Sequence, residues 1–171
     1  MNINRDTIYE EKVTSPRTEL LFVVLAILFF LLFIWRANTG LDALAIVLCC
    51  VFCMFLFYSV NYRTLIIRLS SECLKLKFGI FTWRVHLDNI DECLHDDNIP
   101  TLMRLGGAGI HFMMVRKRYR ASFNFLEHPR VVISFKRKAG LVRDISFSTR
   151  QPNDVIRYVQ DTISSKTKEL L

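Results

Sequence analysis

The residues best suited to chemistry are two short runs of Lys and Arg in the second half of the chain. Cations gathered on one surface can bind phosphate or carboxylate groups, and each one near an anionic membrane contributes about 1 kcal/mol of attraction. The candidate anionic-surface contacts are Arg116, Lys117, Arg118, Arg120, Lys136, Arg137 and Lys138. If the strands that carry them are neighbours, these cations converge on one rim of a folded domain.

The same charges fit two other interpretations. One is an ordinary solvated face combined with the excess of basic residues typical of the cytoplasmic side of a membrane. The other is nucleic acid, whose phosphates would be neutralised by the same side chains. Tyr119, Phe123 and Phe125 alternate onto the face opposite Arg118 and Arg120, so we expect them in the core. The sequence therefore favours anionic lipid or a protein partner and predicts no nucleic acid.

Catalytic arrangements do not emerge from the remaining polar residues. His86, His111 and His128 have no Ser, Cys or acid at a spacing typical of a triad or an acid–base pair. The glycine cluster at 106–109 lacks the strand–loop–helix setting of a phosphate-binding loop and is expected to be a bend. We therefore expect no enzyme and no cofactor.

Metal ligands and disulfides are not expected either. The spacing within one acidic segment matches no firm ligand motif. Its members are Glu92, His95, Asp96 and Asp97. Three of the five cysteines lie inside an apolar run, and Cys73 and Cys93 belong to a part expected in the reducing cytoplasm, where disulfides are rare.

Two apolar runs near the N-terminus would hold the domain that carries these basic residues at a membrane. They cover residues 20–35 and 43–60, and a helix needs about 20 residues to cross a bilayer. We predict two transmembrane helices at about 19–36 and 42–60 within residues 19–62, preceded by a cytoplasmic tail at 1–18. A signal peptide or a pair of buried core helices would be less consistent with the acidic residues before the first run and the absence of a polar face.

Basic residues at the outer ends of both runs indicate the orientation. Lys12 and Arg17 precede the first run, Arg63 and Arg68 follow the second, and the connection between the runs has no basic excess. The cytoplasmic side of a membrane protein carries the excess of Lys and Arg. We therefore predict a multi-pass protein of the cell (inner or plasma) membrane with both termini in the cytoplasm.

Residues 63–171 read as one small domain of short strands ending in a helix. Alternating apolar residues bounded by turns predict about six or seven antiparallel strands. These strands are expected at 64–69, 73–78, 81–87, 110–115, 131–135 and 141–147, with an acidic connection at 88–97 and a turn at 137–140. Residues 115–125 fit either one continuous strand or a hairpin with its tip at 116–118. Pro152 and Asp154 predict a helix over 152–168.

Four short segments resemble the bacterial pleckstrin-homology (PH-like) domain families that follow one or two membrane helices. They are LKLKFG at 74–79, LDNI at 87–90, RLGG at 104–107, and ISFS with the following QP at 145–152. The resemblance covers residues 63–164. It implies an α+β chain in which the transmembrane hairpin is followed by a bent antiparallel β-barrel or sandwich capped by a C-terminal helix. It implies no common catalytic function, and Arg116-Lys117-Arg118 stands where the family often has a glycine and an aromatic.

These observations lead to one functional expectation and one alternative. We expect a non-enzymatic, membrane-anchored PH-like binding or scaffolding protein whose basic cytoplasmic domain contacts protein partners or anionic lipid headgroups. Homo-oligomerisation through the helices or a sheet edge is compatible with this. The alternative is an accessory subunit of a membrane transport, secretion or assembly complex, in which small residues of the second helix such as Ala45 and Cys49 contact a partner helix.

Overall fold

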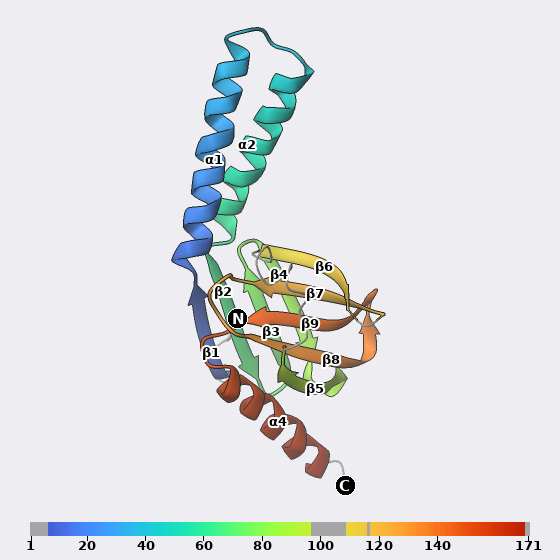
Figure 1. Ribbon diagram of the computed structural model, residues 1–171. Coiled ribbons are helices and arrows are strands. Elements are labelled where there is room, and N and C mark those ends of the chain that lie inside the picture. Colours follow the sequence, from blue (N-terminus) through green and yellow to red (C-terminus); the bar gives the residue numbers. More distant parts are fainter. Residues whose placement is uncertain (1–6, 97–108, 116, 170–171) are drawn as a thin grey trace, which may run out of the picture.

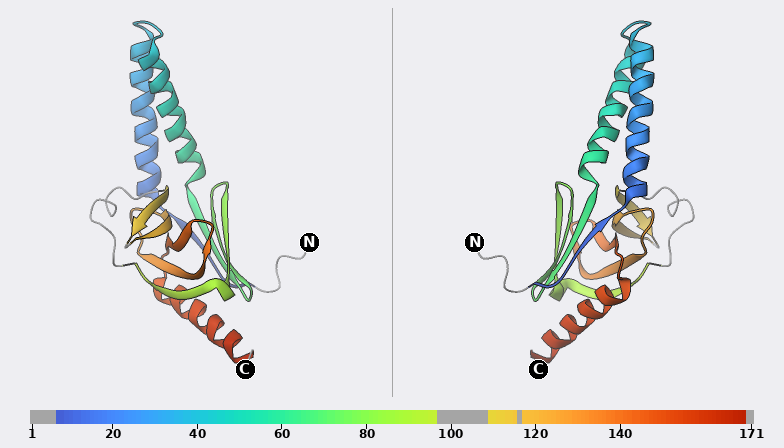
Figure 2. Two further views of the ribbon diagram at one scale, coloured as in Figure 1. Left: turned by 90° about the vertical axis from the view of Figure 1, so that its right-hand side faces the viewer. Right: turned by 90° about the vertical axis from the view of Figure 1, so that its left-hand side faces the viewer.

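A helical hairpin stands on one end of a domain built from two β-sheets and a C-terminal helix (Figure 1). The computed structural model describes residues 7–96, 109–115 and 117–169. The C-terminal helix lies at the end of the domain opposite the hairpin in every view (Figures 1 and 2). The chain is thus α+β, with two apolar helices followed by sheets rich in antiparallel pairs.

The two helices are α1 (Pro16–Ala37) and α2 (Ala43–Asn61), and both are apolar on all sides. Their mean hydropathy is 2.8 and 2.7, and at 1.5 Å per residue they are about 33 and 28 Å long, enough to cross a hydrocarbon core. Aromatic pairs such as Phe29–Phe55, with ring centroids 5.4 Å apart, hold them together. Ala45 is fully buried within the hairpin, so it is not free to meet another helix.

The first sheet, sheet A, is an antiparallel meander in the order β1-β2-β3-β4. Its strands are β1 (Thr7–Thr14), β2 (Thr64–Ser70), β3 (Cys73–Phe78) and β4 (Phe81–His86). The helical hairpin is inserted between β1 and β2, which pair along their length up to Thr14 opposite Thr64. The whole helical hairpin therefore takes the place of a turn in a β-hairpin.

Strand β1 was not predicted, because residues 1–18 were expected to form a cytoplasmic tail. Its alternation is weak, since Ile8 is exposed while Glu11 points toward the chain that leads into the C-terminal helix. The Glu11 carboxylate accepts hydrogen bonds from the Thr149 hydroxyl (2.5 Å) and the Arg150 amide (2.8 Å). Tyr9 donates to the same carboxylate, and burial together with this bond raises the pKa of Tyr9. An acid thus occupies an inward position usually held by an apolar residue.

The second sheet, sheet B, has the order β5-β8-β9-β7-β6. Its strands are β5 (Ile90–His95), β6 (Gly109–Val115), β7 (Arg118–Asn124), β8 (Arg130–Ala139) and β9 (Val142–Ser148). Strands β7 and β9 pair in parallel, and the other neighbours are antiparallel. After the helical hairpin the described residues form eight strands, β2 to β9, where about six or seven antiparallel strands were expected, and one neighbouring pair is parallel.

Three local predictions in sheet B are resolved. The continuous strand over 115–125 is wrong and the hairpin is confirmed, because β6 and β7 pair antiparallel and Lys117 adopts a positive φ of 64°. The segment at 88–97 is not only a connection, since it contains the short helix η1 (Leu87–Asn89) and β5. Strand β8 continues to Ala139, which confines the predicted turn to Gly140 and Leu141.

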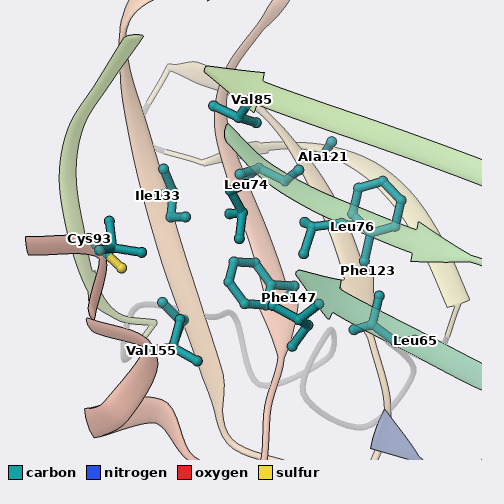
Figure 3. Close-up of a cluster of buried hydrophobic side chains, with 14 of the residues drawn as sticks. Leu65, Leu74, Leu76, Val85, Cys93, Ala121, Phe123, Ile133, Phe147 and Val155 are labelled. Atoms are coloured by element: carbon teal, nitrogen blue, oxygen red, sulfur yellow. The ribbon is translucent and has the colours of Figure 1, made fainter. Parts of the chain in front are cut away.

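The core lies between the two sheets and is closed by α4 (Pro152–Glu169) (Figure 3). Leu74 and Leu76 of sheet A meet Phe123 and Phe147 of sheet B, and Val155 of α4 enters from the helix side. A helix over 152–168 was expected, and its start at Pro152 is confirmed. Cys93 belongs to this core, where burial raises the pKa of its thiol to about 12 and keeps the group neutral.

Candidate functional site

The first turn of α1 is hydrogen-bonded to the loop that joins β7 to β8. Ser15 is the N-cap of α1, accepting the Thr18 amide at 3.1 Å, and its hydroxyl donates to Glu127 Oε1 at 2.9 Å. The Arg17 amide donates to the same oxygen at 2.8 Å. These two bonds, the Arg17 amide first, hold the pKa of Glu127 below its ordinary value. The carboxylate therefore fastens the helix entry to the domain.

The end of α2 is fastened to sheet A. Tyr62 is 5% exposed, donates its amide N–H to the Tyr58 carbonyl at 2.9 Å, and packs against Phe78 with tilted rings whose centroids are 5.0 Å apart. The β3–β4 turn lies against the helix end (Figure 1), so tightly that a Cβ on Gly79 would come 2.1 Å from the Asn61 carbonyl oxygen. Both chains of the helical hairpin are thus held rigidly where they join the domain.

The predicted rim is divided by the fold. Lys117 lies in the turn before β7 and Arg118 starts that strand, whereas Lys136, Arg137 and Lys138 are exposed near the end of β8. Strand β9 lies between these strands, and its pairing with both places the start of β7 and the end of β8 at the same end of sheet B. Arg116 lies outside the described residues. The two runs therefore approach one another across β9 without being on adjacent strands.

Arg120 does not belong to an exposed rim. It is 7% exposed, and its Nη1 lies 2.6 Å from Asp96 Oδ1 while Nη2 lies 3.8 Å from Asp144 Oδ2. Asp96 also accepts a bond from the Ser146 hydroxyl at 2.7 Å. The charge of Arg120 on β7 is thus matched by Asp96, which directly follows β5, and by Asp144 on β9.

A cavity of about 420 Å³ opens beside this buried cluster. Arg118 and Arg120 line it, and so do the three acids Glu92, Asp96 and Asp144. Arg118 Nη1 lies 3.7 Å from Asp144 Oδ1. Because acids outnumber cations on its walls, the cavity is not suited to a phosphate group.

The acidic segment weighed as a metal site is dispersed. Asp96 forms an ion pair with Arg120, and the His95 ring is hydrogen-bonded to Asn153 on α4 at 2.9 Å. Glu92 lies on the cavity wall, and Asp97 falls outside the described residues. Among the residues that the structure describes, no group of three or more His, Cys, Asp or Glu side chains is placed to hold a metal.

The outer face of sheet A gathers cations that the sequence analysis did not single out. Alternate positions on the four strands point away from the core, and cross-strand pairing brings them into rows. We call this surface the basic face, and its cations are Lys12, Arg68, Lys75, Lys77 and Arg84.

Two rows make up most of the basic face. Lys12 and Lys77 flank Ile66 in the row nearer the helical hairpin, and Arg68, Lys75 and Arg84 follow one another in the next row. Glu10 is the acid in these rows, 2.9 Å from Arg68. Cations thus outnumber acids on a face that is open to solvent. The alternation of Lys75 and Lys77 was visible in the sequence, but β1 had to be recognised before Lys12 could join them.

Comparisons with protein-family models, with curated proteins and with solved structures gave no match to this chain.

Proposed function

We propose that the chain is a membrane-anchored, non-enzymatic PH-like binding or scaffolding protein that presents the basic face to an acidic partner beside the bilayer. The observation that carries this is the insertion of the two apolar helices between the paired strands β1 and β2. A domain attached in this way has a fixed orientation, so the basic face is held at one angle to the membrane.

The fold supports the PH-like part of the proposal in outline. A four-stranded antiparallel meander packs against a second sheet, and a C-terminal helix closes the core. The parallel pairing of β7 with β9 departs from a purely antiparallel barrel. Function is therefore argued from the surface and the anchor rather than from the fold.

Topology supports the proposed orientation. The hairpin leaves the domain through β1 and returns to it through β2, so β1, both sheets and α4 lie on one side of any membrane that the hairpin crosses. The surplus of Lys and Arg in the domain favours the cytoplasmic side of the inner or plasma membrane. Cytoplasmic acidic proteins and anionic headgroups would both be within reach.

Charge reversal on each of the two surfaces tests the proposal. The full chain is placed in nanodiscs of neutral lipid, and binding of a fluorescent polyglutamate peptide is measured by anisotropy at low and physiological salt. We expect K75E together with R84E to weaken binding at least tenfold, whereas K136E with K138E leaves it nearly unchanged. Equal losses in the two variants would mean that net charge alone acts, and a loss confined to the second would move the site to sheet B.

The alternative of an accessory subunit depends on the helices. Cys50 and Cys53 are exposed on α2 while Ala45 is buried in the hairpin, so the first two are the small residues able to admit a partner helix closely. Replacing Cys50 and Cys53 by Phe should release a partner subunit in native membranes, while the charge reversals should not.

A further inference from the structure

A second, smaller cavity lies where α2 ends and sheet A begins. It has a volume of about 270 Å³ and is open to solvent on the outer side of β2 and β3. Its lining residues are Val60, Asn61, Arg63, Thr64, Ile66, Lys77 and Gly79. This is the membrane end of the basic face.

The charges at this cavity differ from those of the larger one. Arg63 and Lys77 are its cations, and the described lining residues include no Asp or Glu. Lys12 stands beside Ile66 in the same cross-strand row and adds a third positive charge nearby. Arg63 forms an ion pair with Glu19 of α1, 2.5 Å from an Arg63 Nη atom, so Arg63 is partly neutralised from that side.

The end of α2 is compatible with an anion at this position. A helix C-terminus carries a partial negative charge that would oppose an anion. Asn61 Nδ2 donates to the Phe57 carbonyl at 3.0 Å and the Tyr62 amide to the Tyr58 carbonyl, which pairs two of those carbonyls. Lys77, together with the Arg63 guanidinium that Glu19 partly neutralises, therefore leaves the lining of the cavity with net positive charge.

The surroundings place the cavity at the depth of lipid headgroups. Asn61 is the last residue of an apolar helix that is long enough to span a bilayer. Next to the cavity, Val60 is 66% exposed and Ile80, at the β3–β4 turn, is 67% exposed. Phe81 is also exposed and lies over Tyr62 with ring centroids 6.3 Å apart. Apolar and aromatic side chains beside cations are typical of the membrane–water interface.

We propose that this cavity binds the phosphate of an anionic phospholipid headgroup between Arg63 and Lys77. The Thr64 hydroxyl lines the same cavity and can donate a further hydrogen bond, while Val60 and Ile80 contact the glycerol and the upper acyl chains. This proposal rests on the membrane insertion assumed in the proposed function, and it adds a site that anchors the membrane end of the basic face.

Native mass spectrometry of the detergent-purified full chain titrated with phosphatidylglycerol tests the site directly. From the contribution of one cation near an anionic surface, each of Arg63 and Lys77 should strengthen binding of the first lipid about fivefold. We therefore expect R63Q with K77Q to weaken that binding about 25-fold. The matched control, K75Q with R84Q, removes the same charge from the next row of the basic face and should change binding by less than about threefold, the effect expected of exposed charges away from the site.

Several results would overturn the proposal. One is that the R63Q/K77Q variant binds the lipid as tightly as the wild type. Another is that the control variant K75Q/R84Q loses as much binding as R63Q/K77Q. Displacement of the lipid by inorganic phosphate at a similar concentration would assign the cavity to free phosphate instead. As a control for folding, both variants should unfold thermally at the same temperature as the wild type, so that a loss of lipid binding cannot be attributed to unfolding.

Failure of this proposal is separable from failure of the membrane anchor. Alkaline carbonate extraction of cell membranes reports insertion without reference to any lipid headgroup. A chain that resists extraction but shows no lipid preference refutes the phosphate site alone, whereas a chain that is extracted refutes the anchor as well.

Discussion

The outer faces of the two sheets show how similar sequence patterns take opposite roles. On sheet A the alternating cations Lys75, Lys77 and Arg84 point into solvent. On sheet B, Arg118 and Arg120 alternate in the same way, yet the Arg120 side chain is 9% exposed and lies between two carboxylates. Alternation therefore identifies a face, but the neighbouring strands decide whether its charges remain available.

The energetic consequences differ as much as the positions. A solvated cation keeps most of its hydration, so it contributes little to folding and is available to an external anion. A buried cation has lost that hydration, and it is tolerated because opposite charges and hydrogen bonds replace the water. The basic face can thus vary with little effect on stability, whereas the Arg120 cluster cannot.

Removal of the Arg120 guanidinium should give the largest loss of stability. R120M leaves the Asp96 and Asp144 carboxylates, which are 3% and 5% exposed, buried without the Arg120 guanidinium, and only Asp144 keeps a cation, Arg118, at 3.7 Å. Breaking a buried pair in this way costs about 3–5 kcal/mol. We expect a matching fall in the free energy of unfolding, measured by denaturant titration of the full chain in detergent.

The control for this prediction is R84M on the basic face, which removes an exposed cation from β4. Surface substitutions of this kind usually change stability by less than about 0.5 kcal/mol. Comparable losses for R84M and R120M would show that the two faces do not differ as described.

The sequence predicts the regions of the fold in which one rule dominates. Long apolar runs and regular alternation identify α1, α2, β2 and β3 with bounds close to those observed. Strand β1 is hidden because Glu11 points inward to bind Thr149 and Arg150, partners more than 130 residues away. Local alternation cannot reveal a hydrogen bond of that separation.

The candidate surfaces were harder to predict than the elements. Arg120 was grouped with Lys117 and Arg118 because pairing with Asp96 and Asp144 depends on the order β5-β8-β9-β7. That order includes a parallel pair, for which the sequence carries no local signal. The basic face likewise depends on the register of four strands, one of which was read as a tail.

The orientation of the basic face depends on the contact between α2 and the β3–β4 turn. G79A places a methyl group against the Asn61 carbonyl oxygen and forces a side chain into a backbone with φ of +60°. The conformation alone costs about 1–2 kcal/mol, and the displaced backbone adds to it. We expect G79A to lower the free energy of unfolding, measured by denaturant titration, by about 2–3 kcal/mol.

Gly140 provides a matched control because its φ is +66° and a Cβ there would meet nothing within 4 Å. G140A should therefore show the conformational cost without the clash. Identical losses for the two variants would mean that the β3–β4 turn moves freely relative to α2, which would remove the fixed orientation of sheet A.

Glu127 is an intermediate case, an exposed charge whose partners are a backbone amide and the Ser15 hydroxyl. Its pKa is lowered in the folded chain, so its stabilisation is present above the ordinary carboxyl range and is lost as pH falls through the lowered pKa. E127Q should destabilise the chain by about 1 kcal/mol at neutral pH, as loss of a helix cap does.

The pH dependence separates Glu127 from a general effect of charge. The difference in melting temperature between E127Q and the wild type should be largest at neutral pH and shrink under acid conditions. E72Q, which changes an exposed acid at the β2–β3 turn, should show no such trend. A difference for E127Q that is constant with pH would contradict the role of the carboxylate at the helix entry.

The smallest effect should come from Glu10, the acid of the basic face. Its carboxylate lies 2.9 Å from Arg68, and both side chains are more than two-fifths exposed, so E10Q should cost less than about 0.5 kcal/mol of stability. The same substitution releases Arg68 and raises the net positive charge of the basic face. Polyglutamate binding in neutral nanodiscs should therefore become tighter while the unfolding midpoint stays the same. A large loss of stability would instead make Glu10 a structural partner of Arg68, as Asp96 is of Arg120. The charges of both faces would then contribute to folding, which would remove the difference between solvated and buried charges.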